Sequence, residues 1–337
     1  MIKTIQDIAK ELDLSTATVS RALNNHTEHL VKSQTKQKIL DFVRETGYKP
    51  NIKARGLAKG KLTDLFLISS QMVVGSIFYD EYFSNLVRGI HSVTAPTEYS
   101  LVILPVENTY TEEDIYNILL NNETAGLILS PYCSHLNFPF DVIKKYSFPV
   151  VTLDIEIKSE NTYAILLDHK EAGYLGAKSL VEKGYRNLVL VSDIKRSLHS
   201  EMRKEGFYDF LNERKPKDVT VKNIEMLLSY TSSQSVLEKI LGESKLPVGV
   251  FALSDEIAVG IVNYLKYKGL RCPEDVGVIG FDGLSIRKYA IPAVNSIGFS
   301  YSKIGEIAAQ ILIDVLSGKE RNKTTFIKAY LTEGESF

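Results

Sequence analysis

The chain has 337 residues, of which 24% are charged and 44% apolar, the composition of a globular protein of about two to three domains. No apolar run approaches the roughly 18 residues of a transmembrane helix, and the N-terminus shows no signal peptide. Two cysteines, Cys133 and Cys272, are too few for a disulfide framework or a cysteine zinc site. We therefore expect a cytoplasmic protein without metal or cofactor, rather than a secreted, membrane or disordered one.

The charge is unevenly distributed along the chain. Residues 1–61 hold 12 basic and 6 acidic side chains, a net charge of +6, whereas the remaining residues hold 28 basic and 35 acidic, a net charge of −7. A basic head on an acidic body indicates a polyanion as the partner of the head.

The head carries the pattern of a helix-turn-helix. Thr4 and Asp7 resemble a capping box, and Ser15 can cap a second helix from Thr16 to about Asn24. Two short helices with a connection of three or four residues are typical of this motif. A third helix, Ser33–Thr46, is predicted to close a small core and to end at Gly47.

The second helix of such a unit lies in the major groove of DNA, and its first residues meet the base edges. Arg21 has the geometry to bind O6 and N7 of guanine with two hydrogen bonds, and Ala17 can touch a thymine methyl group. A phosphate contact is the alternative for Arg21. The predicted contact residues are Thr16, Ala17, Thr18, Ser20 and Arg21.

The body alternates apolar strands with helix-like stretches such as Tyr82–Val93 and His169–Lys183. Seven apolar runs are predicted strands: 65–68, 101–104, 126–129, 150–153, 188–191, 248–252 and 276–281. Continuous apolar strands with crossover helices predict parallel sheets covered on both faces, here two doubly wound lobes. Ligands bind such sheets at the carboxyl ends of the strands. No phosphate loop, nucleophile elbow or metalloprotease motif is present, so we expect no enzyme.

Three blocks of the head, residues 4–9, 15–24 and 47–51, resemble the lactose/galactose repressor family. The resemblance implies a homodimeric, DNA-binding regulator, with residues 1–50 as the DNA-binding domain and 51–61 as a hinge helix that folds on DNA. Leu57 would enter the minor groove as an apolar wedge, or, alternatively, pack on the body. The further DNA contacts that the resemblance implies are Thr4, Asn24, Tyr48, Asn51 and Lys59.

The resemblance extends over the body, residues 62–337, through blocks such as 87–90, 168–173 and 280–282. It implies the two-lobed fold of periplasmic sugar-binding proteins, with lobe one at about 62–161 plus 295–325 and lobe two at about 162–294 plus the tail. Carboxylates would accept hydrogen bonds from sugar hydroxyls, and aromatic rings would cover the C–H face. The implied effector-binding residues are Tyr82, Phe83, Ser130, Asp154, Glu201, Tyr230, Ser254, Asp282, Phe299 and Tyr301.

Two of these positions depart from the family pattern. Counting back from Gly206 puts Glu201 where the family has an effector-binding arginine, and Ser254 stands in place of asparagine. Arg203 lies two residues further along and is expected to point elsewhere on the helix. Because a carboxylate replaces donors by acceptors, we expect a neutral or amine-bearing sugar-like effector rather than an anionic one.

The preferred interpretation is a repressor that binds a pseudo-palindromic operator as a dimer and responds to a small sugar-like molecule. A solute-binding protein with an added head, an enzyme with a DNA module, and a regulator controlled by a protein partner are the alternatives. The C-terminal residues carry no heptad repeat, so a dimer is expected rather than a tetramer.

Overall fold

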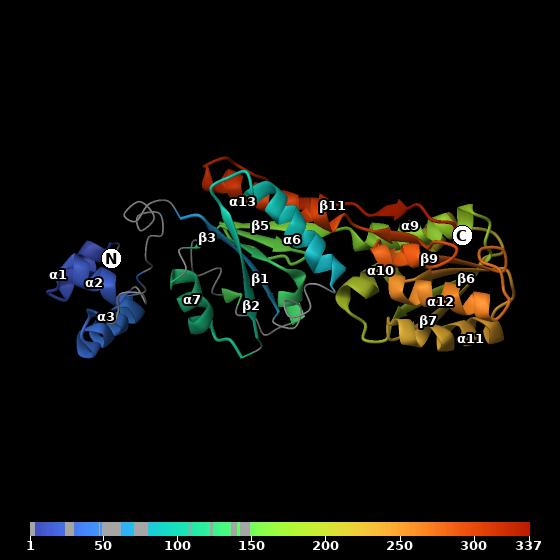
Figure 1. Cartoon of the computed structure of the whole chain (residues 1–337), viewed down its shortest axis with the longest axis horizontal. Helices are drawn as coiled ribbons and strands as arrows, with labels where there is room; N and C mark the ends of the chain where they lie inside the picture. The colour runs from blue at the N-terminus through green and yellow to red at the C-terminus, as the bar shows by residue number, and fades with distance from the viewer. Residues whose placement is uncertain are drawn as a thin grey trace. The chain divides into compact units, whose positions relative to one another are not determined.

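The computed structural model describes residues 4–23, 30–46, 48, 62–70, 80–107, 109–121, 124–135, 140–141 and 149–337. These residues form a helical head and two β-sheets, each with its own helices (Figure 1). The predicted hinge helix, with Asn51, Leu57 and Lys59, lies outside the described residues, as does Asn24. No helix within the described ranges is long and apolar enough to cross a bilayer.

The head is the predicted helix-turn-helix followed by a third helix. Thr4 N donates to the Asp7 carboxylate at 2.9 Å and Asp7 N donates to the Thr4 hydroxyl at 3.2 Å, so the capping box is confirmed. Ser15 Oγ accepts from Thr18 N at 3.0 Å and caps the second helix. The helices of the head are α1 (Ile5–Glu11), α2 (Thr16–Ala22) and α3 (Ser33–Thr46).

Apolar side chains from all three helices meet in a small core of the head. The core turns the polar face of α2 outward, because Val19 and Ala22 are buried on the opposite face. The buried members of this core are Ile8, Ala9, Leu12, Val19, Ala22, Ile39 and Tyr48.

The first sheet of the body has six strands in the order β11-β5-β4-β3-β1-β2. β1 pairs in parallel with β2 and β3, and β3 pairs in parallel with β4. The strands are β1 (Asp64–Ser70), β2 (Ser100–Val106), β3 (Thr124–Leu129), β4 (Val150–Leu153), β5 (Thr162–Leu167) and β11 (Thr324–Ile327). The helical elements that follow the first three strands are α6 (Glu81–Thr94), α7 (Glu112–Asn121) and η2 (Pro131–His135), and α13 (Tyr301–Leu316) precedes β11.

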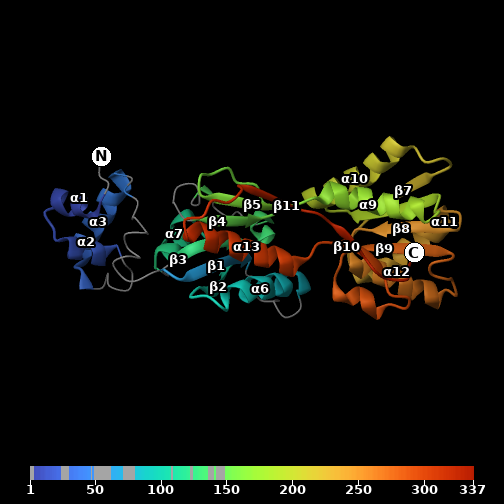
Figure 2. The ribbon, with the colours of Figure 1, turned by 90° about the horizontal axis from the view of Figure 1, so that it is seen from above.

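The second sheet has the order β12-β10-β9-β8-β6-β7. Helices α9 and α10 cover one face and α11 and α12 the other (Figure 2). The strands are β6 (Asn187–Asp193), β7 (Thr220–Met226), β8 (Val248–Ala252), β9 (Val276–Asp282), β10 (Asn295–Gly298) and β12 (Tyr330–Thr332). The helical elements are α9 (His169–Glu182), α10 (Leu198–Arg214), η3 (Tyr230–Ser232), α11 (Ser233–Glu243), α12 (Asp255–Tyr267) and η4 (Ser285–Tyr289).

The two sheets repeat one doubly wound strand order, since the first strand of each lies between the second and the third. β6 pairs in parallel with β7 and β8, and β9 pairs in parallel with β8 and β10. The predicted fold class, two parallel doubly wound lobes, is confirmed. Such sheets bind ligands where the strand order reverses, which in the second sheet is at the carboxyl ends of β6 and β8.

Two segments differ from the predicted lobes, because residues 78–86 and 295–304 were expected in lobe one and belong to the second unit. The chain divides into a first unit of residues 1–77, 87–164 and 305–324, and a second unit of residues 78–86, 165–304 and 325–337. Residues 295–304 were expected in lobe one, but Ser296 pairs with Gly280, so β10 extends the second sheet. The chain therefore leaves the second unit after Ile304, within the first turn of α13.

Candidate functional site

The exposed face of α2 is the first candidate site. Thr16, Ala17, Ser20 and Arg21 are exposed, whereas Thr18 is partly buried and its hydroxyl lies 2.8 Å from that of Ser15. The hydroxyl of Thr4 is engaged in the capping box. The first turns of α2 thus present small polar groups and one guanidinium, the set expected of a helix that binds in the major groove.

Tyr48 occupies a different place from the other predicted DNA contacts. Its side chain is only 8% exposed and packs in the core of the head. This burial, with the nearby charge of Asp7, raises the pKa of the Tyr48 hydroxyl. The ring therefore stabilises the head, and a contact of its hydroxyl with DNA stays a prediction.

The second candidate site lies in the second unit and depends on the contact between α9 and α10. A Cβ atom on Gly173 of α9 would lie 1.8 Å from the carbonyl oxygen of Arg203, and one on Gly206 of α10 would lie 1.9 Å from that of Lys170. The two helices therefore approach backbone to backbone, which requires glycine at both positions. This close contact sets the position of the first turns of α10 against the start of α9.

Arg203 is placed by that contact. Its guanidinium carbon lies 3.7 Å from the centre of the Phe281 ring, a cation–π arrangement on the last residues of β9. Its Nε donates to His169 Nδ1 at 3.2 Å. A nitrogen that accepts this bond carries no proton, so His169 is oriented with Nε2 as its donor. The guanidinium is thus held by two neighbours.

Aromatic rings extend this cluster. His169 stacks on His199 with ring centres 4.5 Å apart, and its edge meets Phe299 at 5.4 Å. Phe299 in turn lies 6.2 Å from Phe281. The rings of His169, Phe281 and Phe299 are almost fully buried beside the Arg203 guanidinium, and the ring of His199 is partly exposed.

Asp282 ends β9 in a strained backbone conformation. Its φ angle is 110°, a region that favours glycine, and the next residue, Gly283, has a φ angle of 73°. Gly298 makes this turn possible, because a Cβ atom there would lie 2.5 Å from the Asp282 carbonyl carbon. The turn is thus built from three positions on two neighbouring strands.

Burial is the main electrostatic influence on Asp282 and raises its pKa to about 7. The Arg203 guanidinium acts in the opposite direction, and the carboxylates of Glu256 and Asp80 add to the rise. The pKa of the Tyr301 hydroxyl is raised for the same first reason, its burial. A carboxyl group that exchanges its proton near neutral pH, beside a fixed guanidinium, marks a candidate binding site.

The structure brings several predicted effector residues into this cluster. Asp282 and Phe299 belong to it directly, and Tyr301 packs edge-on against Tyr82 with ring centres 4.4 Å apart. Phe83 follows Tyr82 but is fully buried, so it supports the fold rather than facing a ligand.

The other predicted effector residues have local partners. Ser254 caps α12, its Oγ accepting from Glu256 N at 3.2 Å, and Tyr230 in η3 accepts from Asn263 Nδ2 at 3.3 Å. Ser130 and Asp154 belong to the first unit, where Ser130 donates to Ser69 at 2.8 Å and Asp154 has a φ angle of 56°. Their roles in binding an effector stay predictions.

Arg203 points away from Glu201, as expected, and it is Arg203 that lies beside Asp282. Two residues on an α-helix are about 200° apart around its axis, so Glu201 and Arg203 face different neighbours. Arg203 faces His169, Phe281 and Asp282, whereas the charge of Glu201 acts on Arg196. Glu201 Oε1 is buried and has no hydrogen-bond partner among the described residues.

Four residues of the cluster were missed by the sequence analysis. Counting from Gly206 to Glu201 overlooked Arg203, and a count of three residues back would have found it. His169, His199 and Phe281 carry no signal of their own in the sequence, since only the crossing of α9, α10 and β9 brings their rings together.

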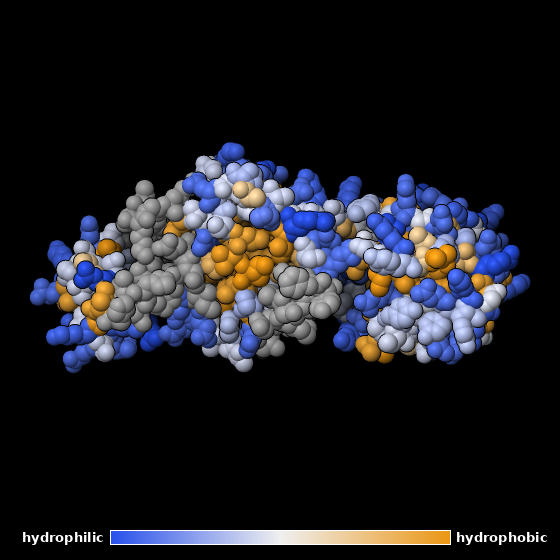
Figure 3. Space-filling model, in the orientation of Figure 1, coloured by the Kyte–Doolittle hydropathy of each residue, from blue (hydrophilic) through white to orange (hydrophobic). Residues whose placement is uncertain are grey.

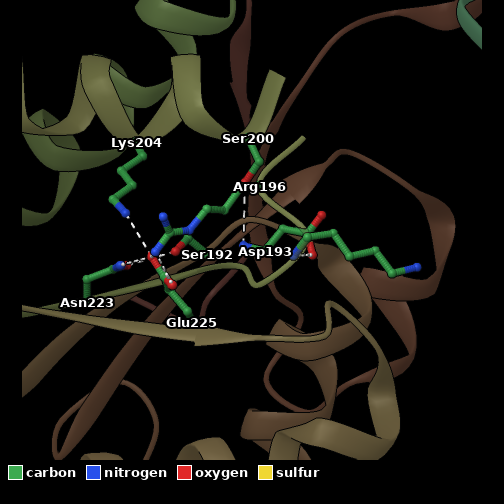
Figure 4. Close-up of polar contacts among 8 residues, drawn as sticks. Ser192, Asp193, Arg196, Ser200, Lys204, Asn223 and Glu225 are labelled. Atoms are coloured by element: carbon green, nitrogen blue, oxygen red, sulfur yellow. Dashed lines mark hydrogen bonds and ion pairs between the residues drawn. The ribbon is translucent and has the colours of Figure 1, made fainter. Parts of the chain in front are cut away.

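A second polar cluster anchors α10 to the sheet (Figure 4). Glu225, near the end of β7, binds Arg196 and Lys204, each at 3.0 Å. Both hydrogen bonds, that of Arg196 first, lower the pKa of Glu225. Ser200 Oγ accepts from Asp193 N at 3.4 Å. These contacts tie the first two turns of α10 to β6 and β7, and Arg203 lies within those turns.

A helix-turn-helix head followed by a doubly wound body with an arginine–carboxyl–aromatic cluster defines a DNA-binding, ligand-responsive regulator. Comparison with known proteins gives the same class. Residues 4–51 match the model of bacterial regulatory proteins of the lacI family, and residues 177–337 match the periplasmic binding protein-like domain. The two matches together span more than half of the chain. This chain belongs to the lacI family of DNA-binding transcriptional regulators.

Curated relatives cover nearly the whole chain. The probable HTH-type transcriptional repressor ExuR of Bacillus subtilis (strain 168) is 27% identical over 317 residues, 94% of this chain and 92% of that protein. Catabolite control protein A of Priestia megaterium is 29% identical over 316 residues, 92% of this chain and 91% of that protein. These relatives are transcriptional regulators rather than enzymes.

Solved structures show the same fold. A complex of the transcriptional regulator CelR with cellobiose has a TM-score of 0.66 and 19% identity, with 100% of both chains covered. A Lac repressor dimer bound to operator and the anti-inducer ONPF also has a TM-score of 0.66, with 21% identity, 100% of this chain and 99% of that one being covered.

Proposed function

We propose that this protein is a repressor whose affinity for a DNA operator is controlled by a sugar-like effector, a small molecule bound by the cluster around Arg203 and Asp282. The observation that carries the proposal is the fixed guanidinium 3.7 Å above Phe281, beside a carboxyl group with a pKa near neutrality. Guanidinium donors and a carboxylate acceptor suit the vicinal hydroxyl groups of a sugar.

The charges near the cluster favour a neutral or amine-bearing effector. Arg203 is the cation beside Asp282, and the carboxylates of Glu256 and Asp80 act on the same carboxyl group. An added phosphate or carboxylate would meet these acidic groups as well as the guanidinium. Glu201 led to the expectation of a neutral or amine-bearing effector. We keep this ligand class, but because of the charges around Asp282.

We infer that the protein acts as a homodimer on a pseudo-palindromic operator in the cytoplasm, where the DNA is. On the first unit, apolar side chains gather over the sheet near its end strand (Figure 3). Residues Leu101–Pro105 of that strand, β2, are only partly buried although four of the five are aliphatic and the fifth is proline. A face of this kind supports pairing with a second copy of the chain.

Calorimetric titration with D-ribose, cellobiose, D-glucosamine and glucose 6-phosphate tests the ligand class. We expect heat of binding from a neutral or amino sugar and its loss in Asp282→Asn. Binding of the phosphorylated sugar alone would overturn the proposed class. Binding that is unchanged in Asp282→Asn would place the effector elsewhere.

Selection of binding sites from a random DNA duplex pool tests the operator. We expect enrichment of a pseudo-palindrome, its half-sites related by two-fold symmetry. Enrichment of a single half-site would contradict the dimer, and no enrichment with retained sugar binding would contradict a direct role in repression.

A further inference from the structure

Asp255, the first residue of α12, has no side-chain exposure at all, although it carries a titratable carboxyl group. It does not serve as the helix cap, because Ser254 Oγ already accepts from Glu256 N. Taking a carboxyl group out of water is unfavourable unless its neighbours compensate. The neighbours of Asp255 therefore indicate what it does.

One oxygen of Asp255 binds the segment that follows β9. Its Oδ2 accepts from Leu284 N at 2.7 Å. The carboxyl group lies flat on the strand at Gly280, where a Cβ atom would be 2.2 Å from Oδ1. Oδ1 has no hydrogen-bond partner in the described part of the chain. Glycine at position 280 thus leaves room beside β9 for the Asp255 carboxyl group, which is hydrogen-bonded to Leu284 in the segment after Asp282.

That bond ends on the strained turn of the effector site. Asp282 and Gly283 have φ angles of 110° and 73°, and Gly283 N donates to Ser296 Oγ at 3.0 Å. Strained conformations persist only where surrounding contacts hold them. Ser296 holds the first residue after Asp282, and Asp255 holds the second.

We propose that Asp255 is a positioning residue of the effector site, and that its hydrogen bond to Leu284 holds the turn in which Asp282 presents its carboxyl group. The inference rests on the proposed function, in which Asp282 binds the effector. It adds a residue that touches no ligand and acts through the backbone of the turn.

The charge state of Asp255 follows from its surroundings. Burial, and after it the charge of Asp282 on β9, raises the pKa of Asp255 to about 8. This pKa is lowered by hydrogen bonds from the Ser296 side chain and the Leu284 backbone, and by the charge of the Arg287 guanidinium in η4. Asp255 is therefore mostly a neutral acid at pH 7, and an asparagine amide imitates its shape and its acceptor oxygen.

The test compares Asp255→Ala and Asp255→Asn in the full, ligand-free chain. Nuclear magnetic resonance measures amide hydrogen exchange of Leu284 and the titration of the Asp282 carboxyl carbon. We expect exchange at Leu284 to rise about tenfold or more in Asp255→Ala, the size expected for one lost buried hydrogen bond. The pKa of Asp282 is expected to move towards its ordinary value. Asp255→Asn should restore both readouts.

Asp275→Asn is the matched control. It removes another carboxylate from the same unit, one that binds Arg271 at 2.7 Å, and should leave Leu284 and Asp282 unchanged. If Asp255→Ala does not fold, Asp255→Ser, whose hydroxyl is too short to reach Leu284, replaces it. Unchanged Leu284 exchange or an unmoved Asp282 pKa in the Ala or Ser variant overturns the proposal. Because no sugar is used, this failure is distinct from a failure of the proposed function.

Discussion

The guanidinium of Arg203 stacks on the ring of Phe281, and its Nε donates a hydrogen bond to His169 Nδ1 at 3.2 Å. One contact joins α10 to the end of β9 and the other joins α10 to the start of α9. A side chain fixed from two sides loses little conformational freedom when a ligand binds, so a contact with it carries a low entropic cost. Arg203 is therefore the residue on which the proposed effector site depends most.

Arg203→Lys should weaken effector binding by about tenfold or more, because an ammonium group lacks the planar fork that stacks and donates at once. Calorimetry with the sugar that binds the unaltered protein measures the loss. Arg214→Gln, which removes one positive charge from the exposed end of the same helix, is the matched control. Equal affinities in all three proteins would show that Arg203 does not touch the effector.

Gly206→Ala should destabilise the second unit and displace Arg203. The new Cβ atom would lie 1.9 Å from the Lys170 carbonyl oxygen, so α9 and α10 must separate, at a cost of about 1–3 kcal/mol or more. Thermal unfolding and calorimetry measure the two effects. Gly242→Ala on α11 is the control, since nothing lies within 4 Å of its Cβ position. That change should stabilise the protein by about 0.5–1 kcal/mol. Similar effects of the two changes would contradict the close helix contact.

The free energy of unfolding should fall as pH rises from about 4 to about 8. The pKa values of Asp282 and Asp255 are raised from 3.8 to about 7 and about 8, so the folded protein keeps protons that the unfolded chain has lost. The stabilisation is fully present below the unfolded pKa and disappears as pH passes the folded pKa, with a slope of at most about 1.4 kcal/mol per pH unit for each group.

Denaturant unfolding at pH 5, 6, 7 and 8 measures this slope. Asp282→Asn should flatten it, since an amide does not titrate and asparagine tolerates a positive φ angle. Asp275, whose pKa is lowered to about 2 by Arg271, has lost its proton in both states above pH 5, so Asp275→Asn should leave the slope unchanged. A slope that is the same in Asp282→Asn would refute the buried titration.

Arg21→Ala should relax the choice of operator sequence. A lost pair of hydrogen bonds to guanine removes about 1–3 kcal/mol of discrimination at one base pair. Binding to the selected operator and to single-base variants measures it by anisotropy, with Lys38→Ala on α3 as an exposed basic control. Uniform weakening on every sequence would instead identify Arg21 as a phosphate contact.

Local sequence signals were sufficient for the head and for seven of the strands, whereas β5, β7, β10, β11 and β12 have no counterpart among the predicted runs. The capping groups of Thr4, Asp7 and Ser15 sit where their spacing predicts, and α3 has the predicted bounds. The seven apolar runs all lie in strands. β7 was missed because it is an end strand in which only Ile224 is buried, so its sequence has no continuous apolar run.

The candidate site could be predicted only in part. Asp282 ends a predicted strand, whereas Phe299 was expected from the family resemblance alone, because β10 before it was not predicted. The direction of a side chain on a helix depends on what the helix crosses. The reciprocal contact at Gly173 and Gly206 determines which face of α10 meets β9, and it brings Arg203 rather than Glu201 to the cluster. Long-range contacts of this kind are not visible in the spacing of residues.

The most direct test is the affinity of the protein for its selected operator, measured by fluorescence anisotropy with and without the bound sugar. We expect the sugar to change this affinity by about 5–150-fold, the usual range of coupling between two sites. Arg203→Lys should raise the sugar concentration needed for this change by about tenfold or more, while leaving the affinity of the ligand-free protein for DNA as it is. A sugar that binds the second unit but leaves operator affinity unaltered would contradict an effector-controlled repressor.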